Sequence, residues 1–395
     1  MDFVQRLRYN RFFKTSYADP SEFYDSLILA PSRIAKVTGI NVLSKDYKVF
    51  TFRLFTVFVG MVIYFYTSFV TAYQVRRSTE ELIFCLVTIG IGFQVPTKVF
   101  TCVIYRKEMV WIHQYARDLY HQECSPRTKT KLMSDIFLVS VIVKVMLLCY
   151  AFTSISLILA PLLYTMQTGE KTLPFGFYIP QLDRDTWFGY FCNYAMQIYL
   201  TAYVSSLDMG TDCIYMMTLM SSFTQIDLLK MSLVEMNKMI DNEDEEIDNF
   251  FIRVIKRHQE HLKYLKTVEL VYRVNFFLTF ACLSSVLVMA MFAALKLSWY
   301  QGYVFIAFLS YQLFFGCFLG TLLAIKNEQL QQAIYKVTWY KLSIPNQKML
   351  QFVLKSSQES VCMSLIFAPL DMSTYLQVYK SIYSLFTMLL TVEDE

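Results

Sequence analysis

Long apolar stretches alternate with polar segments along the chain, and seven of them are long enough to cross a membrane. They run over residues 54–75, 82–105, 136–169, 186–207, 274–295, 297–325 and 372–392. A bilayer core about 30 Å thick needs roughly 20 apolar residues at about 1.5 Å rise per residue. Lys98 and Lys380 lie inside the second and seventh stretches and must snorkel or face protein. The pattern predicts an all-α membrane protein with seven transmembrane helices.

The polar segment after the fourth stretch continues the helical pattern outside the membrane. Residues 213–273 carry apolar side chains at three-to-four spacing on both sides of an acidic run, 241–248. This arrangement predicts a helical hairpin whose turn is the acidic run. His258 and His261 stand three residues apart in its second helix and could bind a metal. Without a third ligand in view, surface positions are the favoured interpretation.

Two other polar segments also carry structural signals. The segment after the sixth stretch predicts one helix over residues 327–342 and another ending near Cys362, separated at Ser343-Ile344-Pro345. Within the sixth stretch, Gly316 and Gly320 have the spacing of closely packed membrane helices. At the N-terminus, basic and aromatic residues alternate as in an interfacial segment: Arg6, Arg8 and Arg11 among Phe3, Leu7, Phe12 and Phe13.

The basic residues are distributed very unevenly between the two sides of the predicted spans. Of 36 Lys and Arg residues, 27 fall before the first span or in the segments after spans 2, 4 and 6, against 5 on the other side. The positive-inside rule therefore places the N-terminus in the cytoplasm and the C-terminus outside. Four regions result: a cytoplasmic N-terminal segment 1–53, spans 1–6 over 54–325 including the hairpin, cytoplasmic anchor helices 326–371, and the seventh span with its extracellular tail 372–395.

Composition and motifs exclude several classes of function. Hydrophobic residues make up 55% and charged residues 17%, which excludes a disordered, collagen-like or disulfide-dense chain. The net charge of +4 is accounted for by the membrane topology, so no nucleic acid is expected as a partner. Walker loops, Gly-x-Ser-x-Gly and His-Glu-x-x-His are absent from the sequence. We therefore expect no enzyme, no catalytic residues, no metal and no cofactor.

The seventh stretch separates polar from apolar side chains. Its polar residues recur at three-to-four spacing and share one helix face: Gln377, Lys380, Ser381, Ser384, Thr387 and Thr391. The opposite face carries Val378, Ile382, Leu385, Leu389 and Val392. Two interpretations compete: a helix–helix interface bonded through Ser and Thr, and a pore-lining face that Met388 narrows. One such helix cannot enclose a pore, so the second interpretation requires an oligomer.

The same region resembles the C-terminal signature of insect odorant receptors. The resemblance covers the stretch from Thr374 to Leu390, and Gly320, Ala333, Ile334, Tyr335, Trp339 and Tyr340 match the family pattern upstream of it. Leu173-Pro174-Phe175, with Tyr178 and Pro180, is similar to the family's second outside loop. The chain lacks the Gln-Phe ending of gustatory receptors and the long intracellular insertion of the shared co-receptor. It therefore resembles a ligand-tuned subunit.

The resemblance implies a function and a set of residues. It implies a ligand-gated, non-selective cation channel in the plasma membrane of olfactory neurons, formed as a heteromeric tetramer with the co-receptor and opened by a small volatile odorant. Met388 would lie near the gate with Thr391 and Val392 just outside it. Gln377, Ser381, Ser384 and Thr387 would line the pore. Tyr335, Trp339 and Tyr340 would belong to the cytoplasmic subunit anchor.

The odorant pocket of the family lies in the outer half of the membrane among spans 2, 3, 4 and 6. Counting inward about seven residues, or ~10 Å, from the outside end of each span gives candidate contacts. They are Phe84, Thr88, Phe152, Ser156, Leu159, Tyr194, Gln197, Ile198, Phe305, Phe308 and Tyr311. A gustatory-type receptor channel, a seven-span metabotropic receptor and a transporter are the alternative functions.

Overall fold

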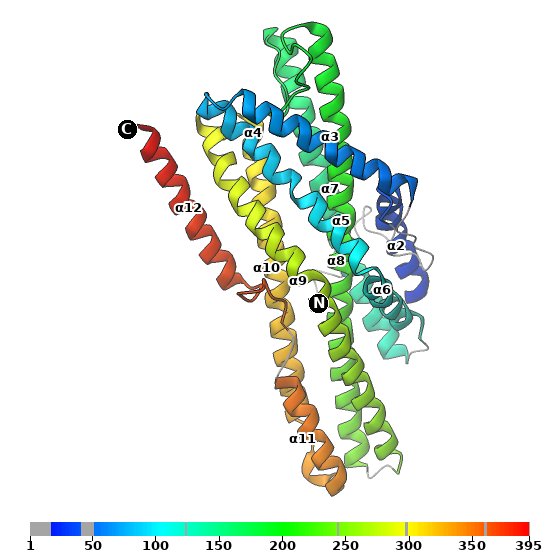
Figure 1. The fold of residues 1–395 in the computed structure, drawn as a ribbon. Helices are drawn as coiled ribbons and strands as arrows, with labels where there is room; N and C mark the ends of the chain where they lie inside the picture. The colour runs from blue at the N-terminus through cyan, green and yellow to red at the C-terminus, as the bar shows by residue number, and fades with distance from the viewer. Residues whose placement is uncertain are drawn as a thin grey trace.

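The chain folds into an elongated bundle of α-helices (Figure 1). The computed structural model describes residues 17–40, 51–122, 125–242, 245–296, 299–358 and 362–394. Over these ranges the elements are α2 Pro20–Val37, α3 Phe52–Gln74, α4 Thr79–Gly92, α5 Gln94–Ile104, α6 Arg106–His121, α7 Pro126–Thr168, α8 Trp187–Asp241, α9 Ile247–Lys296, α10 Gln301–Tyr335, a 3-10 turn η1 Trp339–Lys341, α11 Ile344–Gln358 and α12 Met372–Asp394. The predicted interfacial segment, with Arg6, Arg8 and Arg11, lies outside the described residues.

Every predicted span coincides with helical structure in the described part of the chain. Among those residues, five helices are long and apolar enough to cross a membrane: α3, the α4–α5 pair, α7, α9 and α10. The fourth and seventh predicted spans form the first part of α8 and nearly all of α12. Tyr, Asn and Gln in α8, and the polar stripe in α12, lower the mean hydropathy of these two helices. The structure is therefore an all-α bundle with several membrane-type helices.

The second predicted span is divided into α4 and α5 at Phe93. Pro96 stands in the first turn of α5. It cannot donate a backbone hydrogen bond, and its ring conflicts with the carbonyl of the preceding turn, which interrupts the helix there. Gln94 and Lys98 on α5 are both buried. The interruption therefore brings two polar side chains into the bundle.

Helix α8 is the central element of the bundle and runs for 55 residues. It packs against α2, α7, α9 and α10. Residues 213–226 are buried without interruption, on all sides of the helix. Helix α8 ends at Asp241 and α9 begins at Ile247, so the acidic run lies at the turn between them. The lower part of Figure 1 shows these two helices side by side, next to α11.

The histidines of the hairpin are buried, which corrects the expectation of surface positions. His258 and His261 are 3% and 1% exposed. They lie on the face of α9 that packs on α8, and His261 Nδ1 is 2.9 Å from Gln225 Oε1. Burial lowers the pKa of His258 to about 4 and that of His261 to about 3. The lowered pKa values make the pair a neutral part of the core at physiological pH.

We expect this pair to make the hairpin sensitive to acid. An unfolded histidine titrates near about 6.5, so between about pH 6.5 and pH 4 the unfolded chain binds more protons than the folded one. The free energy of unfolding should therefore decrease as the pH is lowered. At about pH 5 this decrease is roughly 2 kcal/mol per buried histidine. The measurement is the melting temperature of the purified protein between pH 7.5 and 5. The double variant His258→Leu/His261→Gln should lose part of this dependence, whereas His121→Gln at an exposed site should keep it. Equal pH slopes for the wild type and the double variant would contradict the expectation.

The segment after α10 differs in detail from the predicted pair of helices. Helix α10 ends at Tyr335, a 3-10 turn follows, and α11 begins at Ile344. The sequence Ser343-Ile344-Pro345 thus starts a helix rather than only breaking one, because a proline in the first turn needs no hydrogen-bonded N–H. Helix α11 ends at Gln358, and residues 359–361 lie outside the described ranges.

Candidate functional site

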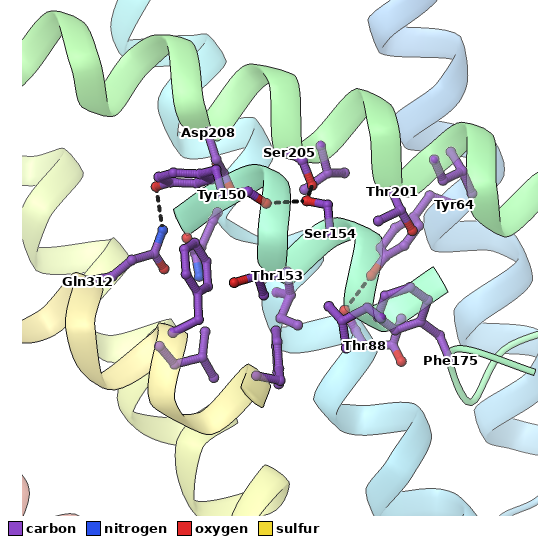
Figure 2. A pocket seen from close by; sticks show the side chains of 18 of the residues that line it. Tyr64, Thr88, Tyr150, Thr153, Ser154, Phe175, Thr201, Ser205, Asp208 and Gln312 are labelled. Carbon is purple, nitrogen blue, oxygen red and sulfur yellow. Dashed lines mark hydrogen bonds between the residues drawn. The ribbon is translucent and has the colours of Figure 1, made fainter. Parts of the chain in front are cut away.

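A cavity lies inside the bundle between α3, α4, α5, α7, α8 and α10. Its volume is about 80 Å³, which is room for a small molecule and not for a peptide. Its lining is mostly apolar and aromatic with a few polar groups (Figure 2), as in small-molecule sites generally. The lining residues are Tyr64, Thr88, Ile91, Gln94, Tyr150, Thr153, Ser154, Leu157, Phe175, Phe177, Leu200, Thr201, Val204, Ser205, Asp208, Phe305, Phe308, Leu309 and Gln312.

The connection between α7 and α8 covers one end of the cavity. Gln197 Oε1 accepts a hydrogen bond from the N–H of Phe175 at 3.1 Å, and its Nε2 donates to the carbonyl of Phe177 at 2.6 Å. Asn193 Oδ1 accepts from the N–H of Ile179 at 2.7 Å. These buried amides hold the connection against α8, and Phe175 and Phe177 thereby line the cavity. The connection begins at Gly169, where φ is +77°, a conformation that glycine adopts without steric cost.

Most hydroxyl groups of the cavity donate to their own helices. Thr201 Oγ1 donates to the carbonyl of Gln197 at 2.7 Å, and Thr153 Oγ1 donates to that of Cys149 at 2.9 Å. Tyr64 Oη donates to the carbonyl of Thr88. Because these protons are engaged inside the protein, the hydroxyls face the cavity chiefly as acceptors.

The inner end of the cavity holds a buried ionic cluster. Lys98 Nζ lies 2.8 Å from Asp212 Oδ1 and 3.1 Å from Asp208 Oδ1. Tyr150 Oη donates to Asp212 Oδ2, and Gln312 Nε2 donates to Tyr150 Oη at 2.8 Å. Figure 2 shows Tyr150, Gln312 and Asp208 together at this end. The cluster therefore links α5, α7, α8 and α10, and three of its side chains, Tyr150, Asp208 and Gln312, also line the cavity.

Three of the eleven predicted pocket residues line the cavity: Thr88, Phe305 and Phe308. Tyr194 and Gln197 are buried nearby but act on the backbone, Tyr194 by donating to the carbonyl of Ile158.

The other predicted pocket residues lie outside the cavity lining. Phe84 packs edge-on against Trp299, and Tyr311 stacks on Phe315. Ser156 is half-buried on α7. Phe152, Leu159 and Ile198 are exposed on the outer surface of their helices.

Sequence reasoning missed the polar end of the cavity and its cover. Gln94, Tyr150, Asp208 and Gln312 line the cavity but were not among the candidates. Lys98 was the available signal, because a lysine inside a membrane span needs a buried counter-charge. Asp208 is the nearest acidic residue that follows the fourth span, and it could have been paired with Lys98 on that ground.

Helix α12 stands apart from the bundle and contacts it along one side only (Figure 1). Its buried side is Ile382 and Phe386, with Tyr375 and Tyr379 partly buried against α10. Gln377, Ser381, Ser384, Met388 and Thr391 are exposed, and Thr387 is half-buried. Leu385 and Leu389, assigned from sequence to the apolar face, are also exposed, because Ile382 and Val378 of that face make the contact together with the aromatic residues. The side chain of Val392 lies outside the described part of the structure.

The three predicted anchor residues lie at the far end of α10 and in the following turn. Tyr335, Trp339 and Tyr340 are all exposed in the single chain. The rings of Trp339 and Tyr340 lie edge to face, with centroids 6.1 Å apart. Ile344 and Phe352 on α11 add further exposed apolar area nearby.

Comparison with known proteins identifies the family. A family model described as "7tm Odorant receptor" matches residues 78–383, more than half of the chain. The chain belongs to this odorant receptor family. The receptor is 24% identical over 396 residues to a Drosophila melanogaster protein named as a candidate odorant receptor, 83c, covering 94% of this chain and 98% of that protein. Its relatives are odorant receptors, a family not known for enzymes.

Solved structures share the fold of the receptor. The insect olfactory receptor OR5 from Machilis hrabei superposes with a TM-score of 0.81, at 13% identity and covering 95% of this chain and 100% of that one. The same receptor in complex with eugenol superposes with a TM-score of 0.79, at 14% identity over 93% and 99% of the two chains. At this identity the likeness concerns the fold alone.

Proposed function

We propose that the receptor is an odorant-binding subunit of a ligand-gated, non-selective cation channel of the plasma membrane. The observation that carries the proposal is the aromatic-walled cavity inside the bundle of a chain from the odorant receptor family. The fold relative in complex with eugenol supports a small organic ligand. A small volatile molecule would bury its apolar body against Phe305 and Phe308, as aromatic pockets favour.

The proposed topology has seven spans, a cytoplasmic N-terminus and an extracellular C-terminus. The connections α3–α4 and α7–α8 lie toward the upper end of the bundle in Figure 1, and the α8–α9 turn and α11 lie at the opposite end. This separation of the ends agrees with the distribution of Lys and Arg in the sequence. Residues 326–371 would then form the cytoplasmic anchor, where exposed Tyr335, Trp339 and Tyr340 meet neighbouring subunits.

Helix α12 is proposed to line the pore of a tetramer that also contains co-receptor subunits. A membrane helix with exposed Ser and Thr at regular spacing needs water or polar partners on that side. Ser384, Met388 and Thr391 are exposed, and Met388 is 63% exposed in the single chain. Four such helices around an axis would satisfy the polar stripe and bring the Met388 side chains together.

Helix α10 provides a physical connection between the cavity and α12. Phe308 and Gln312 line the cavity, and the neighbouring Ser310 accepts a hydrogen bond from Tyr379 of α12. Phe314 of α10 lies edge to face with Tyr375, with ring centroids 5.7 Å apart. A ligand that favours one position of α10 would thereby bias the position of α12 and shift the population of open channels.

The experiment that tests the function is current recording from cells that express the receptor with and without the co-receptor. A panel of small volatiles should evoke cation currents only when both are present. A metabotropic receptor would instead need G-protein signalling, and a transporter would give uptake without unitary currents. Absence of any ligand-evoked current at normal surface abundance would contradict the proposal.

Filling the cavity should weaken ligand action. Thr201 lines the cavity and hydrogen-bonds only within its own helix turn, so Thr201→Phe adds volume at little other cost. We expect the half-maximal concentration of an active odorant to rise at least about tenfold, equal to about 1.4 kcal/mol of binding free energy. The neighbouring Ala202 is exposed on the outer surface, so Ala202→Phe should leave that concentration nearly unchanged. Similar dose–response curves for both variants would argue against this cavity as the odorant-binding site.

Opening the proposed constriction should raise the basal current. Met388→Ala removes the largest apolar side chain of the polar stripe, and hydrophobic constrictions close by excluding water. We expect a several-fold higher current without odorant in cells that also express the co-receptor. Leu389→Ala is the control, because Leu389 is also exposed but points about 100° away on the helix. Unchanged basal current in Met388→Ala would show that Met388 does not form the gate.

A further inference from the structure

The charges at the inner end of the cavity do not balance. Two carboxylates, Asp208 and Asp212, share one ammonium group, that of Lys98. Asp212 is well satisfied, because it also accepts the hydrogen bond of Tyr150 and lies 3.5 Å from Gln312 Nε2. Asp208 has Lys98 alone, and its side chain is only 9% exposed. One negative charge at the cavity wall is therefore left without a counter-charge of its own.

The hydrogen-bonding groups at this end are also unbalanced. Asp208 Oδ1 has the ammonium group of Lys98, 3.1 Å away, as its partner, and the buried Gln94 Oε1 receives no hydrogen bond from the described residues. Both residues line the cavity, from α8 and α5 respectively. Ser154 Oγ offers no free proton, because it lies 2.8 Å from the carbonyl of Tyr150 and 2.7 Å from Ser205 Oγ. A molecule that binds at this end can therefore gain by supplying hydrogen-bond donors to Asp208 and Gln94.

The remainder of the cavity is suited to an apolar body. Phe175 and Phe177 from the covering connection and Phe305 and Phe308 from α10 contribute aromatic rings to its walls. Among the residues that the structure describes, Asp208 is the one charged residue in the lining. A ligand that fits would have one cationic, hydrogen-donating end and an apolar remainder.

We propose that the cavity is selective for small molecules that carry a protonated amine. The ammonium group would lie between Asp208 and Gln94, and the hydrocarbon part would lie against the phenylalanine rings. A neutral alcohol could donate one hydrogen bond, but only a cation both supplies several donors and neutralises the surplus carboxylate. The inference rests on the proposed function, and it names the ligand class of that same cavity.

The test uses three probes of nearly equal shape on cells that express the receptor and the co-receptor: 2-phenylethylamine, 2-phenylethanol and propylbenzene. We expect the amine to be at least about tenfold more potent than the alcohol, the difference between a charge-assisted and a neutral hydrogen bond. The hydrocarbon should be the weakest of the three. Equal potency of amine and alcohol would overturn the inference.

Substitutions at Asp208 and Gln94 test whether these two residues cause the preference for the amine. Asp208→Asn keeps the shape and removes the charge, so the amine should lose its advantage while the response to the alcohol remains. Gln94→Leu should reduce the response to the amine several-fold more than the response to propylbenzene. Asp185→Asn removes one charge on the exposed α7–α8 connection and should change neither. An undiminished amine preference in both cavity variants would overturn the inference.

The outcomes for function and for ligand class are distinguishable. If no molecule of a broad panel evokes current in the wild type, the proposed channel function fails. If neutral odorants evoke currents and amines are no more potent, the channel function stands and the amine selectivity is wrong. Should Asp208→Asn fail to reach the cell surface, the wild-type potency order and Gln94→Leu still decide the result.

Discussion

Replacing Lys98 with methionine is expected to remove most of the folded receptor from the cell surface. Lys98 is 4% exposed and is the cation nearest to both Asp208 and Asp212. Without it, two carboxylates remain in a low-dielectric site, and breaking a buried pair in this way lowers the free energy of unfolding by roughly 3–5 kcal/mol. That is a large part of the total stability of a typical domain, about 5–15 kcal/mol. Surface biotinylation and the melting temperature in detergent are the measurements.

Two further variants separate the loss of the ion pair from the loss of the lysine itself. The triple variant Lys98→Met/Asp208→Asn/Asp212→Asn contains no uncompensated charge, so it should recover much of the lost surface abundance. Lys380→Met removes the lysine of the seventh span, which is exposed on α12, and should have a small effect. If Lys98→Met is as abundant and as stable as the wild type, the ionic cluster does not hold the four helices together.

Replacing Gly320 with alanine should displace the start of α12. A Cβ atom at Gly320 would lie 1.9 Å from the carbonyl oxygen of Leu370, a backbone atom that cannot move aside alone. The adjacent Thr321 accepts a hydrogen bond from the N–H of Met372 at 3.0 Å, so α12 is attached to α10 at this point. Overpacking here should lower the free energy of unfolding by about 3 kcal/mol and disturb gating as well.

Gly60 is the matched control for this substitution. It also lies inside a helix, α3, but no atom of the described structure lies within 4 Å of its added Cβ. Gly60→Ala should therefore be neutral or stabilise the receptor by about 0.5–1 kcal/mol, the usual gain from removing a helix glycine. Comparable melting temperatures for the two alanine variants would refute the close approach of Leu370 to α10.

The pattern of predicted spans gives the depth of a residue in the membrane but not the direction in which its side chain points. Counting from the outside end of each span estimates depth in the membrane, and Thr88, Phe305 and Phe308 were found in this way. Depth says nothing about rotation of the helix about its axis. Phe152 and Ile198 were chosen at similar depth and face outward. The long helices are apolar on all sides, so periodicity alone does not indicate which face meets the cavity.

Long-range contacts explain most of what the sequence did not predict. The acidic run is a local signal, and it predicts where α8 ends and where α9 begins. The cover formed by Phe175 and Phe177 depends on Gln197, about 20 residues further along the chain. Tyr64 also lines the cavity, although its helix α3 is not among the spans from which the candidate contacts are taken. The burial of His258 and His261 likewise depends on α8 packing against α9.

The uninterrupted burial of residues 213–226 in α8 has a consequence for how relatives of the receptor diverge. Along most helices, half of the positions face lipid or water and can change without altering the packing. In this part of α8 no such side exists, because α2, α7, α9 and α10 pack around the helix. Substitutions here must conserve volume on all sides at once. Among receptors tuned to different odorants, we therefore expect the sequence to vary around the cavity and residues 213–226 to change least.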